Sequence, residues 1–143
     1  MPWYTEYMEK TTATADYKRD EQRVHLIVYH LVWCPRRRKP VLVGAVAEWC
    51  RALIEDKCAE KGWVVLSVAI QPDHVHLFVQ VWPTDSASDV VKECKGLTSH
   101  HLRREFPHLL TLPSMWTRSF FSSVMQPTQD VIATFLDAQK GRR

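Results

Sequence analysis

Four stretches of β-branched and aromatic residues lie between polar or proline-containing segments, and this pattern predicts four β-strands. The expected strands cover residues 24–34, 63–70, 74–82 and 120–124. In the third stretch aliphatic residues occupy every second position, as in a strand with one buried face. The turn residues Gln71-Pro72-Asp73 separate the second strand from the third, so we expect these two strands to form a hairpin.

Two longer segments place hydrophobic residues at the three- and four-residue spacing of an amphipathic helix. The first covers about residues 44–61 and ends before Gly62, a residue type that commonly follows a helix. The second starts at a capping-box-like Ser86-x-x-Asp89 and ends before Pro107. Its expected buried face consists of Val90, Val91, Cys94, Leu97, His101 and Leu102.

The expected elements follow one another as β-α-β-β-α-β, with one further helix at the C-terminal end. Residues 107–119 form a loop in this assignment, and residues 128–140 form the last helix. The order predicts an α+β fold of the ferredoxin-like, split β-α-β type: a four-stranded antiparallel sheet with two helices on one face, plus the C-terminal helix. The 143 residues fit one domain, expected over residues 22–143 after an N-terminal arm of residues 1–21.

With 45% hydrophobic and 24% charged residues, the chain has the composition of an ordinary globular protein. It has no apolar run long enough to cross a bilayer and no signal-peptide pattern at its start, so we expect a cytoplasmic location. The four cysteines form no CxxC pair and lie among apolar residues, which favours buried, reduced thiols over a disulfide framework or a zinc site. They are Cys34, Cys50, Cys58 and Cys94.

Positive charges are clustered along the chain, although its net charge is only +3. The first cluster follows the first strand and comprises Arg36, Arg37, Arg38 and Lys39; the second lies on the second helix and comprises Lys92, Lys95, Arg103 and Arg104. Such clusters, with six tryptophans, suit single-stranded nucleic acid, because cations hold phosphates and flat rings stack on bases. The alternative is an ordinary solvated surface with tryptophans in the core.

The third predicted strand carries the most informative side chains. Its aliphatic face, which belongs against the helices, consists of Val75, Leu77, Val79 and Val81. Its other face consists of His74, His76, Phe78, Gln80 and Trp82. Two imidazoles two residues apart on an uncovered face lie close enough to share one metal ion. Two solvated histidines would explain the same pattern.

A third metal ligand is available on the predicted last helix. Gln139 follows Phe135 by four residues, so both lie on one helical face. An amide oxygen beside two imidazoles suits Mg²⁺ or Mn²⁺ better than structural zinc, which prefers closed, thiolate-rich sites. A solvent-facing helix end is the alternative interpretation of Gln139.

One segment resembles a known family signature. Gln71-Pro72-Asp73-His74-Val75-His76-Leu77 is similar to the central motif of the TnpA-type, single-tyrosine HUH transposases of small insertion sequences, which include the REP-associated tyrosine transposases. Further matches in order and spacing are Tyr29-His30-Leu31-Val32-Trp33, Lys95-Gly96 and Trp116-Thr117-Arg118-Ser119-Phe120-Phe121. The resemblance extends over roughly residues 22–141.

This resemblance implies specific roles. His74, His76 and Gln139 would hold a divalent metal, Mg²⁺ or Mn²⁺, that polarises the scissile phosphate. A tyrosine at position 135 would attack the phosphorus and form a 5′-phosphotyrosine link with the DNA. Members of the family bind hairpins in single-stranded DNA and act as homodimers, with the last helix docking on the partner subunit. The two basic clusters would then contact DNA.

Position 135 of this chain is phenylalanine, which has no oxygen that could attack phosphorus. We therefore expect the chain to be inactive in cleavage. A substitute nucleophile would have to come from the first thirty residues, which contain all four tyrosines: Tyr4, Tyr7, Tyr17 and Tyr29. Two explanations stay open, an engineered Tyr→Phe knock-out and a naturally inactive relative that only binds hairpins. A third class of function, a small-molecule metal phosphohydrolase that uses the two histidines, would need no hairpin.

Overall fold

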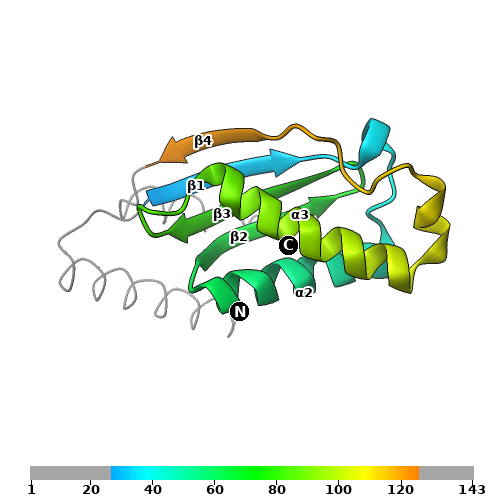
Figure 1. Ribbon diagram of the computed structural model, residues 1–143, viewed down its shortest axis with the longest axis horizontal. Helices are drawn as coiled ribbons and strands as arrows, with labels where there is room; N and C mark the ends of the chain where they lie inside the picture. Colours follow the sequence, from blue (N-terminus) through cyan, green and yellow to red (C-terminus); the bar gives the residue numbers. More distant parts are fainter. Residues whose placement is uncertain (1–26, 126–143) are drawn as a thin grey trace, which may run out of the picture.

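The computed structural model describes residues 27–125, which follow the predicted β-α-β-β-α-β order (Figure 1). The strands are β1 (Ile27–Trp33), β2 (Val64–Gln71), β3 (His74–Val81) and β4 (Phe121–Met125). The helices are α2 (Gly44–Lys61) and α3 (Ala87–Glu105), with two short 3-10 helices, η1 (Arg36–Arg38) and η2 (Pro107–Thr111). The predicted N-terminal arm and last helix lie outside the described residues. No helix within them is long and apolar enough to cross a membrane.

The four strands form one antiparallel sheet in the order β2-β3-β1-β4. Each helix connects two strands that are not neighbours, α2 between β1 and β2 and α3 between β3 and β4. Figure 1 shows both helices on the same side of the sheet. This arrangement confirms the predicted α+β fold of the ferredoxin-like type, with two helices on one face.

The ends of both helices follow from local chemistry. Gly62 ends α2 in the left-handed conformation, with a φ of 76°, which costs glycine little because it lacks a Cβ atom. Ser86 begins α3, and its hydroxyl oxygen accepts a hydrogen bond from the backbone N–H of Asp89 at 3.0 Å. Both predicted helix ends are confirmed. The predicted loop 107–119 is wrong at its start, because η2 occupies part of it.

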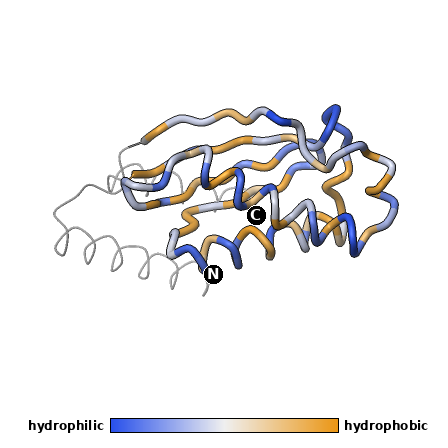
Figure 2. The backbone as a smooth tube through the Cα atoms, in the orientation of Figure 1, coloured by the Kyte–Doolittle hydropathy of each residue, from blue (hydrophilic) through white to orange (hydrophobic). Residues whose placement is uncertain are grey.

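The hydrophobic core lies between the sheet and the two helices. The predicted inner face of β3 is confirmed: Val75, Leu77, Val79 and Val81 are each 0% exposed. Figure 2 shows hydrophobic residues along the strands and a mixture of hydrophobic and hydrophilic residues along the helices, as amphipathic helices require. Trp33, Trp63 and Trp116 are also buried, so three of the six tryptophans belong to the core rather than to a base-stacking surface.

The predicted inner face of α3 needs two corrections. Leu97 and His101 are partly exposed, whereas Thr98 is fully buried. The Thr98 hydroxyl donates to the carbonyl oxygen of Cys94 at 2.7 Å and accepts from the indole N–H of Trp116 at 3.0 Å. These two bonds satisfy a polar group that would otherwise be costly to bury. The remaining predicted residues of this face, Val90, Val91, Cys94 and Leu102, are buried.

The cysteines are free thiols, as predicted. Cys50, Cys58 and Cys94 are buried between the helices and the sheet, and burial raises the pKa of Cys50 to about 12. The prediction of burial is wrong for Cys34, which is partly exposed because it follows the end of β1, where the inner face of the sheet stops.

Leu77→Ala is expected to destabilise the fold by about 2 to 5 kcal/mol, the usual cost of removing a fully buried leucine side chain. Urea unfolding followed by circular dichroism measures this change. Leu110→Ala is the matched control, because the side chain of Leu110 is 58% exposed and its loss should leave the free energy of unfolding nearly unchanged. Equal effects of the two substitutions would contradict the assignment of Leu77 to the core.

Candidate metal and DNA-binding site

Two histidines of β3 form the centre of the candidate site. His74 and His76 are both partly buried, and the centroids of their rings lie 4.8 Å apart. The rings meet at an interplanar angle of 73°. Because side chains alternate along a strand, both rings project from the face of the sheet opposite the helices. The structure therefore brings the two predicted metal ligands together.

His74 is held by a neighbouring carboxylate. Its Nδ1 lies 2.7 Å from Oδ1 of Asp73, and Arg38 donates to Oδ2 of the same carboxylate at 2.9 Å. The hydrogen bond from His74, and then the charge of Arg38, lowers the pKa of Asp73. Since Nδ1 of His74 is engaged, a metal would bind this ring through Nε2. Carboxylates that hold the second nitrogen of a metal-binding imidazole are a common feature of metal sites.

His76 is held by a third histidine, His30 on β1. The distance between Nε2 of His30 and Nδ1 of His76 is 3.1 Å. His30 also stacks on Phe78, with ring centroids 4.3 Å apart, and burial lowers its pKa, which favours the neutral ring. A neutral imidazole that binds metal through Nε2 carries its proton on Nδ1. His76 would then donate to His30, and its ring orientation would be set by that bond.

His30 is the residue of the site to which the sequence alone assigned no role. It lies opposite Phe78 in the β1–β3 pairing, which places it two pairs away from the pair that contains His76 and therefore on the same face. Alternation along β1 could have placed His30 on the face opposite Tyr29, but only the strand register shows that it meets His76.

The described residues fit part of a divalent metal site. Two imidazoles with fixed rings are suitable nitrogen ligands for a metal. Within residues 27–125, however, no group of three His, Cys, Asp or Glu residues is placed to hold one. Any further protein ligand must therefore come from another residue type or another part of the chain. Gln139, the expected third ligand, and Phe135 lie outside the described residues.

The predicted open face of the sheet is not open along its whole length. Gln80, which shares this face with His76, is 0% exposed. Neither its amide nitrogen nor its amide oxygen has a hydrogen-bond partner in the described part of the chain. The expectation of an uncovered face is therefore wrong at the Gln80 end of β3, and the accessible part lies toward His74.

Tyr29 is not placed to act as a nucleophile beside the histidine pair. It lies on β1 but on the helix-covered face, where it is only 9% exposed. Its hydroxyl donates to the carbonyl oxygen of Asp85 at 3.0 Å. The sheet separates this hydroxyl from the histidine pair. The other three tyrosines, Tyr4, Tyr7 and Tyr17, lie outside the described residues.

The first basic cluster forms a tight turn beside the histidines. Arg37 and Arg38 have φ values of 57° and 52°, and the turn is linked to β3 through the ion pair between Arg38 and Asp73. Arg36 donates to the hydroxyl oxygen of Ser114 at 3.2 Å. Two of the four cations thus have structural partners, whereas Arg37 and Lys39 are exposed.

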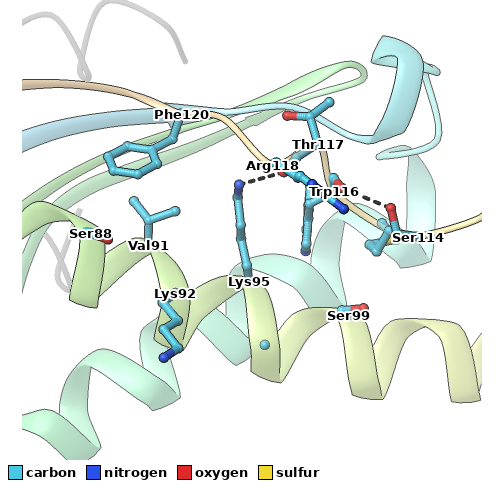
Figure 3. Close-up of a pocket in the computed structure, with 12 residues that line it drawn as sticks. Ser88, Val91, Lys92, Lys95, Ser99, Ser114, Trp116, Thr117, Arg118 and Phe120 are labelled. Carbon is cyan, nitrogen blue, oxygen red and sulfur yellow. Dashed lines mark hydrogen bonds between the residues drawn. The ribbon is translucent and has the colours of Figure 1, made fainter.

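In the second basic cluster, Lys95 has a structural role. Its ammonium group donates to the carbonyl oxygen of Thr117 at 2.7 Å (Figure 3). It also donates to the carbonyl oxygen of Ser119 at 3.1 Å, so it ties α3 to the segment before β4. Burial lowers the pKa of Lys95. A phosphate would have to compete with both carbonyls for this ammonium. Lys92 and Arg104 are exposed and Arg103 is partly exposed.

Comparison with known proteins identifies the family. Residues 23–139 match the family model described as transposase, IS200 like. The ISDra2 transposase TnpA of Deinococcus radiodurans is 31% identical over 126 residues, which cover 85% of this chain and 90% of that relative. A transposase for insertion sequence element IS200 from Salmonella typhimurium is 26% identical over 81 residues, covering 57% of this chain and 53% of that relative.

Solved structures agree with this assignment. A crystal structure of a Deinococcus radiodurans transposase has a TM-score of 0.64 at 27% identity and covers 84% of this chain and 93% of its own. A REP-associated tyrosine transposase bound to a REP hairpin has a TM-score of 0.53 at 17% identity, covering 80% and 64%, which is a likeness of fold alone. With a family model over most of its length and a relative at 31% identity, the chain belongs to the IS200-like transposase family.

Proposed function

We propose that the chain is a single-stranded DNA transposase of the HUH type that binds DNA hairpins at insertion-sequence ends and that, with phenylalanine at position 135, does not cleave them. The observation that carries the proposal is the arrangement of His74 and His76. Both rings share one face, and each has its Nδ1 engaged by a neighbour, so that both would offer Nε2 to the same cation.

His74, His76 and Gln139 would hold Mg²⁺ or Mn²⁺. Such a metal, when bound, supplies Lewis-acid polarisation of a phosphate oxygen. The chain's own side chains prepare this site: Asp73 orients one ring and His30 the other. Carboxylates and imidazoles of this kind limit ring rotation and keep the ligands in position before the metal arrives.

The basic turn supplies charge for the DNA backbone. Arg37 and Lys39 are exposed on η1 or directly after it, and the Arg38–Asp73 ion pair keeps this turn close to His74. Exposed cations near a phosphate-processing site raise the local concentration of DNA. Of the second cluster, Lys92, Arg103 and Arg104 remain candidates for phosphate contacts.

Hairpin binding is supported by family membership and by one structural relative, which was solved with a REP hairpin. The family resemblance also leads us to propose a homodimer in which the last helix docks on the partner subunit. We also propose that the chain acts in the cytoplasm.

The chain is expected to select stem-loops from a randomised pool of single-stranded DNA oligonucleotides. Binding should weaken as salt is raised, with the slope of log affinity against log salt falling by about 0.7 for each phosphate contact to a single strand. Fluorescence anisotropy with a selected hairpin and with the perfect duplex of the same sequence measures the preference. A chain that binds both equally, or neither, would refute the proposal.

The small-molecule alternative is tested on the same preparation. Hydrolysis of bis(p-nitrophenyl) phosphate with Mn²⁺ and without DNA would support a phosphohydrolase and argue against a transposase. We expect no turnover, because family membership supports a DNA strand as the substrate.

A further inference from the structure

The turn after β1 has a backbone conformation that its residues do not favour. Arg37 and Arg38 follow one another with φ values of 57° and 52°, both in the left-handed region. A residue with a Cβ atom is disfavoured there, because the Cβ atom lies too close to the following carbonyl oxygen. Strained backbone that the surrounding structure maintains is concentrated at functional sites. Two consecutive left-handed arginines therefore require an explanation beyond the path of the chain.

Hydrogen bonds to the segment of residues 114–117 hold the turn in place. The backbone N–H of Arg36 donates to the carbonyl oxygen of Met115 at 2.9 Å, and the guanidinium of Arg36 donates to the hydroxyl oxygen of Ser114 at 3.2 Å. Ser114 in turn donates to the carbonyl oxygen of Trp116 at 3.2 Å (Figure 3). The same segment is bonded to α3, as described above. The turn is thus anchored to parts of the chain that lie far from it in sequence.

The turn is also attached to the β2–β3 hairpin. Shortly after it, the backbone N–H of Leu42 donates to the carbonyl oxygen of Pro72 at 3.0 Å. The guanidinium of Arg38 donates to Oδ2 of Asp73 at 2.9 Å, and Oδ1 of the same carboxylate lies 2.7 Å from Nδ1 of His74. Guanidinium, carboxylate and imidazole therefore form one continuous chain of hydrogen bonds.

The contact between Arg38 and Asp73 is not explained by an effect on stability. The side chain of Arg38 is 66% exposed and that of Asp73 is 35% exposed, and exposed ion pairs of this kind add little to the free energy of unfolding. The left-handed backbone at Arg38 acts in the opposite direction. What the contact does provide is a fixed carboxylate, because a group held through Oδ2 cannot turn away from His74.

A fixed carboxylate determines which nitrogen of His74 carries the proton. A neutral imidazole has its proton on Nδ1 or on Nε2, and an acceptor beside Nδ1 keeps the proton on Nδ1. Nε2 is then unprotonated, which is the form in which an imidazole binds a metal. A carboxylate that could rotate freely would allow the other tautomer, in which the proton on Nε2 blocks the cation.

We propose that Arg38 is a positioning residue for the metal site: it holds the Asp73 carboxylate against Nδ1 of His74 and so keeps Nε2 of that ring free for the cation. This inference rests on the proposed function, because the cation is the one proposed there. It also gives Arg38 a role other than the DNA contact expected from its place in the basic cluster. The strained turn serves to aim its guanidinium at the hairpin.

The test compares Arg38→Gly with Arg37→Gly. Both substitutions remove one positive charge from the same turn and replace a left-handed arginine by glycine, but the ion pair with Asp73 belongs to Arg38. Electron paramagnetic resonance of free Mn²⁺ should show binding about 2- to 10-fold weaker for Arg38→Gly, less than the roughly 10- to 100-fold usual for a residue that bonds to a metal ligand directly. Arg37→Gly should not weaken binding, because the loss of a nearby positive charge favours a cation.

Nitrogen-15 NMR of the His74 ring measures the positioning without metal. At a pH where the ring is neutral, the unaltered chain and Arg37→Gly should have the proton mainly on Nδ1, and Arg38→Gly should have a larger share of the Nε2–H form. Arg38→Lys should restore the tautomer and the Mn²⁺ affinity, because an ammonium group also donates to a carboxylate. The free energy of unfolding of Arg38→Gly should not fall, since glycine suits the left-handed backbone, and this separates positioning from a merely structural role.

Equal Mn²⁺ affinities and equal His74 tautomers in the Arg38→Gly and Arg37→Gly chains would overturn the positioning role and leave the proposed metal site intact. No Mn²⁺ binding by the unaltered chain would overturn the site and this inference with it. If Arg38→Gly keeps its Mn²⁺ affinity but lowers the salt-dependence slope of hairpin binding by about 0.7, Arg38 is a phosphate contact instead. Should Arg38→Gly not fold, Arg38→Gln must show the same loss of Mn²⁺ affinity and the same change of tautomer.

Discussion

Replacing Phe135 by tyrosine is expected to produce a chain that forms a covalent adduct with single-stranded hairpin DNA when Mn²⁺ or Mg²⁺ is present. The phenol oxygen would form a bond to phosphorus, the bond from phosphorus to the 3′ oxygen would break, and that oxygen would leave with a proton. The unaltered chain has a phenyl ring at this position and should give no adduct. The change is from no detectable product to a measurable one, which is the largest effect expected here.

The adduct is measured as a band of lower mobility on a denaturing gel. The DNA must be labelled at its 3′ end, because the fragment that keeps the 5′ phosphate stays on the protein. Phe106→Tyr, at the C-terminal end of α3, is the matched control for the addition of a phenol. If Phe135→Tyr gives no adduct with any selected hairpin, residue 135 is not the nucleophile position.

His76→Ala is expected to abolish tight Mn²⁺ binding, because it removes one of the two imidazoles proposed to bind the metal. The affinity for Mn²⁺ should fall by more than the roughly 10- to 100-fold that is usual when a residue that hydrogen-bonds to a metal ligand is replaced. Asp73→Asn, which keeps the shape of the residue that holds His74, should stay within that smaller range. Electron paramagnetic resonance of free Mn²⁺ measures binding directly and does not depend on DNA cleavage.

His108→Ala is the control for this series, since His108 is exposed on η2 and remote in sequence from β3. It should bind Mn²⁺ as the unaltered chain does. Equal affinities of the His76→Ala and unaltered chains would exclude the histidine pair as a metal site. The hairpin affinity of His76→Ala tests whether the chain is a naturally inactive protein that only binds hairpins. Such a protein would lose little hairpin affinity when His76 is replaced.

The sheet and the helices could be predicted because each depends on local signals. Alternating residues from Val75 to Val81 identify the buried face of β3, and Gly62 and Ser86 mark helix ends through their own backbone and side-chain chemistry. The nearness of His74 and His76 follows from the same alternation. For these features, neighbours along the chain contain the necessary information.

Features that depend on distant parts of the chain could not be predicted. Thr98 is buried because Trp116, eighteen positions away, donates to its hydroxyl, and helical spacing alone does not distinguish this position from Leu97. The contact of His30 with His76 depends on strand register. The sequence predicted Lys95 as a phosphate ligand. Its ammonium group instead donates hydrogen bonds to the carbonyl oxygens of Thr117 and Ser119, more than twenty residues further along the chain.

Asp73 uses both of its carboxylate oxygens, one for Arg38 and the other for His74. A single side chain therefore cross-links the basic turn after β1 to the first residue of β3. Substitutions at Arg38 and His74 should consequently be non-additive, since either one removes a partner that restrains the same carboxylate for the other. The effects of substitutions at Arg38, Asp73 and His74 therefore depend on one another. In protein engineering, variants of the turn should be screened together with variants of the strand.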